Sequence, residues 1–167
     1  MAEPLRLESP SVEATEDLAA ELGARLRPGD VVALDGELGA GKTAFVRGLA
    51  RGLGVDEPVS SPTYVLMNVY SGRLELYHFD AWMEGREQAF LADGGGEWLR
   101  AGGVAAVEWA GRVADWLPTP RLAVRLAHAG PEARRVEIEV VPGPDGQDAG
   151  LGALVAALAP PEGAGGA

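Results

Sequence analysis

The sequence predicts a three-layer α/β fold, with a central sheet of mixed parallel and antiparallel strands and helices flanking it. Three observations predict this. Residues 36–43 read GELGAGKT and match the pattern G-x-x-x-x-G-K-[ST] at every position. A short apolar run precedes this octamer, and a helical pattern follows it. Later in the chain, paired strand-like runs are spaced as hairpins, which add antiparallel strands. Together they predict the P-loop NTPase fold.

The residue types of the octamer suit the binding of phosphate. Its glycines permit backbone angles closed to other residues, so successive N–H groups can turn inward around an anion. Lys42 can then reach the outer phosphates, and Thr43 can offer its hydroxyl to Mg²⁺ at the start of the next helix. The predicted nucleotide-binding residues are Gly36, Glu37, Leu38, Gly39, Ala40, Gly41, Lys42 and Thr43.

The flanking residues place the octamer between a strand and a helix. Val31 to Leu34 is a short apolar run bounded by Pro28-Gly29 and Gly36, which is typical of a buried strand. Residues 42–53 then carry apolar side chains at helical spacing. Lys42 is also the only lysine in the chain, where all 13 other basic residues are arginine. A compact ammonium fits a tight phosphate nest that the wide guanidinium of arginine would not.

Before the octamer, the N-terminal part of the chain predicts packing elements. Apolar and polar residues alternate weakly over Leu5 to Glu8, which predicts an edge strand. Ser11 is expected to cap an amphipathic helix. The apolar stripe of that helix is Val12, Leu18, Leu22 and Leu26.

After the octamer, two runs rich in β-branched and aromatic residues follow a loop at 60–63. Tyr64 to Tyr70 and Arg73 to Phe79 predict strands, and Ser71-Gly72 between them has the length and composition of a tight hairpin turn. Residues 83–103 predict two short helical patches around a glycine-rich connection at 93–96.

The C-terminal part predicts a buried strand, a hairpin and a helix. Val104 to Val107 is an apolar run that ends at Glu108, and a short helix is expected to follow through Trp116. Leu122 to Leu126 and Val136 to Val140 predict a second hairpin. Leu151 to Leu158 predicts the last helix. Residues 1–159 are expected to form one domain, and residues 160–167 a disordered tail.

Length and composition bound the class of protein. A chain of 167 residues suits one domain, and without cysteine it has no disulfide, thiolate metal site or cysteine nucleophile. No apolar run is long enough to cross a membrane and no signal peptide is recognisable, so a soluble, cytoplasmic protein is expected. The net charge of −11 argues against nucleic-acid binding by this chain alone.

Acidic residues at predicted strand ends are the candidates for chemistry beside the octamer. Glu108 suits a Mg²⁺ ligand that acts with Thr43, and Asp80 suits either a second metal partner or a base that orients water. The alternative for Asp80 is a cap on the following segment. Thr63 suits a sensor of the terminal phosphate or, alternatively, only a turn. His78 is expected to be a packed strand histidine, because the sequence identifies no carboxylate partner for it.

These motifs together resemble one family over about residues 5–140. They are GELGAGKT at 36–43, SSPTY at 60–64, NVY from Asn68, YHFD at 77–80 and VEW at 107–109. The chain is similar to the TsaE (YjeE) family, P-loop ATPases of bacterial tRNA threonylcarbamoyladenosine biosynthesis. The resemblance implies an ATPase with ATP and Mg²⁺, weak on its own, that acts on the TsaB and TsaD proteins and meets tRNA only through that complex.

The resemblance also implies roles for individual residues. Lys42 would bind phosphates, Thr43 and Glu108 would hold Mg²⁺, Thr63 would act in a switch loop, and Asp80 would be required for hydrolysis. One departure is visible: the family continues its aspartate with Leu-Tyr-Arg, whereas this chain has Ala81-Trp82-Met83. The charge of that arginine is therefore missing here, and Arg86 is the nearby candidate to replace it.

Two other functions are compatible with the same octamer. A small-molecule kinase would pass the phosphate to a bound hydroxyl, but that class usually adds arginines in a mobile lid, and residues 93–96 carry none. A non-catalytic, nucleotide-dependent binding module would keep the loop without hydrolysis. A GTPase is disfavoured, because a chain with one lysine has no N-K-x-D guanine-binding motif.

Overall fold

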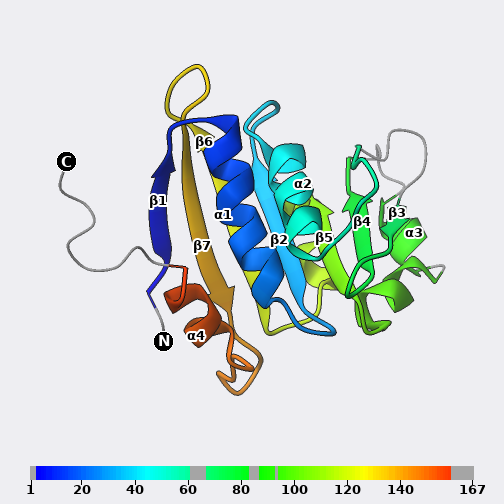
Figure 1. Cartoon of the computed structure of the whole chain (residues 1–167). Helices are drawn as coiled ribbons and strands as arrows, with labels where there is room; N and C mark the ends of the chain where they lie inside the picture. Colours follow the sequence, from blue (N-terminus) through cyan, green and yellow to red (C-terminus); the bar gives the residue numbers. More distant parts are fainter. Residues whose placement is uncertain (1–2, 61–66, 83–86, 93, 159–167) are drawn as a thin grey trace.

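One mixed sheet of seven strands runs through the chain, in the order β1-β7-β6-β2-β5-β4-β3 (Figure 1). The computed structural model describes residues 3–60, 67–82, 87–92 and 94–158. The central pairs β6–β2, β2–β5 and β5–β4 are parallel, and the outer pairs β1–β7, β7–β6 and β4–β3 are antiparallel. The strands are β1 (Leu5–Ser9), β2 (Val31–Gly36), β3 (Met67–Tyr70), β4 (Leu76–Asp80), β5 (Val104–Glu108), β6 (Arg121–His128) and β7 (Arg134–Val141). The predicted mixed sheet is confirmed.

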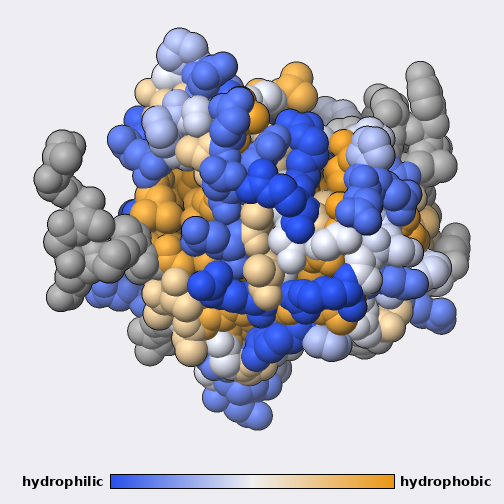
Figure 2. Space-filling model, viewed as in Figure 1, coloured by the Kyte–Doolittle hydropathy of each residue, from blue (hydrophilic) through white to orange (hydrophobic). Residues whose placement is uncertain are grey.

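Three α-helices form the layer on one face of this sheet. They are α1 (Val12–Arg25), α2 (Lys42–Gly52) and α4 (Leu151–Ala156), and Figure 1 shows α1 and α2 lying across the strands. Their apolar sides bury the larger of two core clusters against the sheet. Ser11 caps α1 as predicted, because its hydroxyl accepts the Ala14 N–H at 3.0 Å. The outward side of this layer is largely hydrophilic (Figure 2), as expected for amphipathic helices.

Shorter elements form the layer on the other face, over β2, β5 and β4. They are α3 (Glu87–Ala92) and the 3₁₀ helices η1 (Gly95–Arg100) and η2 (Ala110–Trp116), which bury the second core cluster. The β1-β7-β6 part of this face instead carries charged side chains. Glu137 there pairs with Arg6 at 2.9 Å and with Arg125 at 2.8 Å. Within the described part of the chain, the third layer therefore covers the half of the sheet that contains the parallel strands β2, β5 and β4.

The connection between β3 and β4 differs from the tight turn predicted at Ser71-Gly72. The two strands are antiparallel as expected, but five residues, 71–75, separate them. Long-range contacts hold this segment against the helices. The Arg73 N–H donates to Leu53 O at 2.8 Å, and its guanidinium donates to Gly23 O and Leu26 O at 2.8 and 2.9 Å. These contacts with the ends of α1 and α2 prevent residues 73–75 from continuing the strand.

The remaining predicted elements are present with small changes of boundary. The two short helical patches are α3 and η1, the C-terminal hairpin is β6–β7, and the last helix is α4. The short helix after Trp109 is the 3₁₀ helix η2 rather than an α-helix. Thr63, Arg86 and the predicted tail at 160–167 lie outside the described residues. Among the residues that are described, no helix has the length and apolar character needed to span a membrane.

The crossing of α1 and α2 depends on glycine at position 48. A Cβ at Gly48 would lie 2.3 Å from Glu16 O and 2.6 Å from the Ala19 Cβ. We predict that Gly48→Ala lowers the free energy of unfolding by about 2 kcal/mol, because the cost of overpacking exceeds the roughly 1 kcal/mol gain in helix propensity. Urea denaturation measures this. Glu21→Ala, on the exposed side of α1, is the control and should change stability by less than about 0.5 kcal/mol. Equal stability of Gly48→Ala and wild type would contradict the close crossing.

Candidate phosphate-binding site

The octamer forms the turn from β2 into α2, at the edge where the parallel strands end. Gly39 and Gly41 have φ angles of 77° and 103°, in the left-handed region that favours glycine. The Ala40 N–H donates to Glu37 O at 3.0 Å and closes the turn. Helix α2 begins at Lys42, so the N–H groups of its first turn and the partial positive charge of the helix start face the loop. The backbone thus has the form that the motif predicts.

Lys42 lies inside this loop and is almost fully buried, with 6% of its surface exposed. Its ammonium donates to Gly36 O and, at 3.0 Å, to Glu37 O. The ammonium also lies 3.7 Å from the centre of the Trp109 ring, a cation–π contact. Burial lowers the pKa of Lys42, and nearby carboxylates, Glu108 foremost, act against that shift. The ammonium is therefore held between loop carbonyls and an indole.

Glu108 ends the fully buried strand β5 and faces the start of α2. Only 3% of its surface is exposed. The Thr43 hydroxyl donates to its two carboxylate oxygens at 3.2 and 3.3 Å. On its other side, Oε2 is hydrogen-bonded to Nε2 of His78. The structure therefore brings together Thr43 and Glu108, the two residues predicted to hold Mg²⁺, and adds a histidine to them.

That histidine corrects the sequence interpretation, which identified no carboxylate partner for His78. Its partner is Glu108, on the neighbouring parallel strand. The packing part of the expectation holds, since His78 is fully buried. A signal was present in the sequence: His78 and Asp80 alternate on one strand, and a second strand also ends in an acid. The pairing of those two strands could not be read from the sequence.

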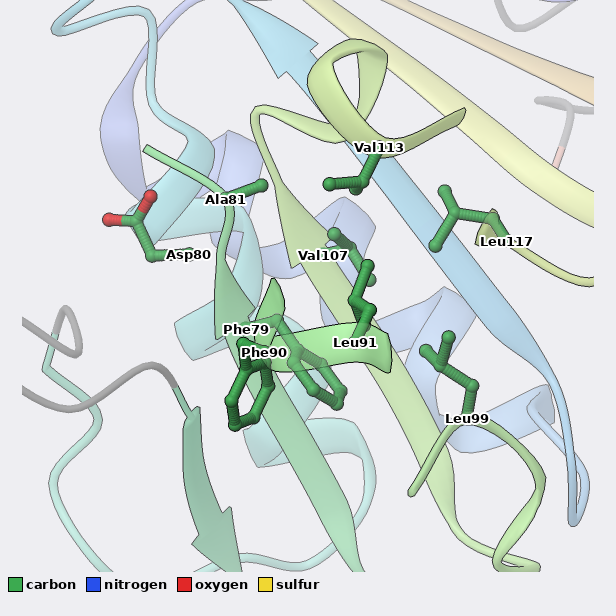
Figure 3. A pocket seen from close by; sticks show the side chains of 9 residues that line it. All are labelled: Phe79, Asp80, Ala81, Phe90, Leu91, Leu99, Val107, Val113 and Leu117. Atoms are coloured by element: carbon green, nitrogen blue, oxygen red, sulfur yellow. The ribbon is translucent and has the colours of Figure 1, made fainter. Parts of the chain in front are cut away.

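Asp80 ends β4 opposite Glu108 in the strand register and is half-buried. One carboxylate oxygen accepts the Trp82 N–H two residues along the chain at 2.9 Å. The alternative role, a cap on the next helical segment, stays a prediction, because residues 83–86 lie outside the described residues. Burial raises the pKa of Asp80, and the Trp82 N–H acts against that shift. Figure 3 shows the carboxylate pointing away from the apolar pocket formed by neighbours such as Phe79 and Leu91. The Asp80 carboxylate thus lies at the edge of the core.

Most of the predicted residues line one hollow of about 340 Å³. Its walls come from the loop, α2, the ends of β4 and β5, and β7. The lining residues that bear on binding are Gly39, Gly41, Lys42, Thr43, Asp80, Glu108, Trp109 and Arg134. The predicted residues Gly36, Glu37 and Ala40 belong to the loop but do not line the hollow. Thr63 lies outside the described residues.

Trp109 follows Glu108 in an unusual backbone conformation. Its φ and ψ of 58° and 39° lie in the left-handed region, which is uncommon for a bulky residue and found where surrounding contacts enforce it. This conformation turns the indole over Lys42. The ring also packs on Trp82, with ring centres 4.7 Å apart. The Trp109 ring, packed on Trp82, therefore lies beside the Lys42 ammonium.

Arg134 is a second residue of the site that the sequence interpretation did not identify. Its guanidinium, at the start of β7, donates to Ala40 O at 3.0 Å and to Gly39 O at 3.2 Å. It also donates to Ala133 O at 2.8 Å and Gly130 O at 3.2 Å within its own hairpin. The Arg134 hydrogen bonds therefore connect the loop of residues 36–43 to the β6–β7 hairpin.

The fold and this loop define the class: an α/β protein with a P-loop. A family model described as threonylcarbamoyl adenosine biosynthesis protein TsaE matches residues 9–136. The chain therefore belongs to the TsaE family.

Individual relatives agree with this assignment. A tRNA threonylcarbamoyladenosine biosynthesis protein TsaE of Treponema pallidum is 42% identical over 122 residues, 73% of this chain and 90% of that protein. The Bacillus subtilis protein of that name is 39% identical over 131 residues, 77% of this chain and 81% of that protein. The crystal structure of Bacillus subtilis YdiB covers 95% of both chains with a TM-score of 0.74 and 32% identity.

The Arg134 contacts lead to a prediction about the loop. Arg134→Ala should weaken ATP binding about tenfold, roughly 1.4 kcal/mol, because the loop carbonyls lose donors and the loop is no longer held in its binding shape. Isothermal titration calorimetry measures the Kd. Arg135→Ala is the matched control, because the side chain of the next residue lies exposed on the opposite face and its loss should leave the Kd unchanged. Equal affinities for the two variants would show that the guanidinium does not shape the loop.

Proposed function

We propose that this protein is a Mg²⁺-dependent ATP-binding and ATP-hydrolysing accessory protein for threonylcarbamoyl modification of the tRNA adenosine beside the anticodon. It would act on a TsaB–TsaD complex in the cytoplasm and meet tRNA only through that complex. One observation carries the proposal: Thr43 and Glu108 meet at 3.2 Å beside Lys42 of an intact P-loop, in a chain of the TsaE family.

The side chains at this point suit a magnesium ion. A hydroxyl and a carboxylate are the hard oxygen ligands that Mg²⁺ prefers. Among the described residues, no group of three or more His, Cys, Asp or Glu side chains could form a complete metal site. This fits an ion held by Thr43 and Glu108 with the rest of its ligands from phosphates and water, as in other P-loop proteins. When bound, such an ion neutralises charge that develops on the transferred phosphoryl group.

Lys42 and the helix start would bind the phosphates. An ammonium has three N–H donors, and two of them are directed at Gly36 O and Glu37 O. The third can serve a phosphate oxygen on the side that the Trp109 ring now covers. The N–H groups of the loop and of the first turn of α2 supply further donors. Phosphate binding would thus exchange an aromatic contact for a charge-assisted hydrogen bond.

Asp80 would orient and deprotonate the attacking water. Its raised pKa, caused by burial, makes the carboxylate a stronger base than an exposed aspartate. It lines the same hollow as Lys42 and Glu108. Thr63 would sense the terminal phosphate from the loop at 60–63. The acidic surface of the chain, with a net charge of −11, favours protein partners over direct contact with tRNA.

We predict that Asp80→Asn, assayed with TsaB and TsaD present, retains ATP binding but releases phosphate at least about 100-fold more slowly, the typical loss for a general base. Lys42→Ala should abolish ATP binding. Phosphate release gives the rate and calorimetry gives the affinity. Asp115→Asn, an exposed aspartate on η2, is the control for the amide change and should hydrolyse at the wild-type rate.

The same assay discriminates between the alternatives. Turnover that depends on an added hydroxyl acceptor would favour the small-molecule kinase over the ATPase. Full activity of the tRNA-modifying complex with Asp80→Asn, which binds ATP without hydrolysing it, would favour the non-catalytic binding module.

A further inference from the structure

His78 is a buried polar residue that the proposed chemistry has not yet used. Five described polar or charged residues are buried, and two of them, Ser9 and Thr15, bond to each other at 2.6 Å. Two others, Lys42 and Glu108, belong to the phosphate site. The remaining one is His78, whose side chain has no exposed surface. A buried imidazole requires a reason, because an apolar side chain of similar size would fill the same space without desolvation.

The strand register places His78 directly behind the carboxylate of Glu108. Strands β4 and β5 are parallel, with His78 opposite Ala106 and Asp80 opposite Glu108. Side chains alternate along a strand, so His78 and Glu108 face the α2 side of the sheet. Leu76 and Ala106 belong to the core cluster on that side, whereas Tyr77 and Phe79 belong to the opposite one. His78 therefore approaches Glu108 from the core, and Thr43 approaches it from the helix.

The contact fixes the imidazole tautomer. An ionised carboxylate only accepts hydrogen bonds, so Nε2, which contacts Oε2 of Glu108, must carry the proton. The other ring nitrogen, Nδ1, is buried without a hydrogen-bond partner among the described residues. Among the described residues, the only hydrogen bond of the His78 ring is therefore the one to the Glu108 carboxylate.

The two donors to Glu108 are not equivalent in the proposed reaction. The Thr43 hydroxyl is itself a proposed metal ligand, so it would have to redirect when the ion binds. The His78 ring has no other partner to move to among the described residues and is packed on every side. His78 can therefore hold Oε2 throughout, which would leave Oε1, 3.2 Å from the Thr43 hydroxyl, for the ion.

We propose that His78 is a positioning residue for the metal: its Nε2–H holds the Glu108 carboxylate in the orientation that Mg²⁺ would need. This inference rests on the proposed function. Hydrogen bonds to ligating carboxylates orient the ligand and tune the metal, and their loss typically weakens metal affinity 10–100-fold. A histidine that served only to fill the core would have no such effect.

Paired substitutions separate positioning from packing. The terminal amide of His78→Gln reaches about as far as Nε2, whereas that of His78→Asn reaches only as far as Nδ1. His78→Leu fills the space without any donor. Leu76→Val, on the same strand and face but away from Glu108, is the matched control for a change in the core.

The readout is the ratio of the ATP Kd in EDTA to the ATP Kd in Mg²⁺, measured by calorimetry on the full chain after thermal unfolding has verified that each variant is folded. We expect His78→Leu and His78→Asn to lower this ratio 10–100-fold, with the Kd in EDTA changed less than about twofold. His78→Gln should stay within about threefold of wild type, and Leu76→Val should match wild type.

Two results would count against the inference in different ways. A wild-type ratio in both His78→Asn and His78→Leu, or equal losses of affinity in Mg²⁺ and EDTA, would overturn the positioning role alone. No magnesium preference in the wild-type protein would overturn the proposed function as well. In a Glu108→Gln background, His78→Leu should not lower the ratio further, because the carboxylate on which His78 acts has been removed.

Discussion

The buried carboxylate of Glu108 is the group on which the arrangement of this site depends. It is carried by β5, accepts hydrogen bonds from Thr43 at the start of α2 at 3.2 and 3.3 Å, and contacts His78 on β4. A carboxylate that is only 3% exposed is stable only when its oxygens are bonded. The Glu108 carboxylate therefore connects β5, α2 and β4. A shift of any of these elements would remove a hydrogen bond from a buried carboxylate.

Lys42 is the buried cationic residue of the site, beside the carboxylate of Glu108. Burial lowers the pKa of Lys42 and raises that of Asp80, so the site disfavours isolated charges of either sign. Lys42 is stabilised by Gly36 O, Glu37 O and the face of Trp109. These are weaker partners than a phosphate oxygen.

How far the sequence could predict this site depended on the separation of the interacting residues. The P-loop and the acid at the end of β5 were predictable, because each lies in a local strand or strand–loop–helix pattern. The His78–Glu108 contact spans 30 residues and the Arg134 contacts with the loop span 94 and 95, so they require the order and register of the strands. The turn predicted at Ser71-Gly72 was wrong for the same reason: Arg73 bonds to Gly23 at the end of α1, 50 residues away.

The antiparallel half of the sheet also has a structural role in the site. Strand β6 pairs with β2 in parallel, and β7 returns beside β6, which brings Arg134 back to the edge where the P-loop lies. A loop with two glycines in left-handed conformations gains backbone freedom when unfolded, and external hydrogen bonds are needed to hold one shape. The guanidinium supplies two of them, to Gly39 and Ala40. The hairpin thus stabilises the observed conformation of the P-loop through Arg134, and Glu108 contacts the start of α2 through Thr43.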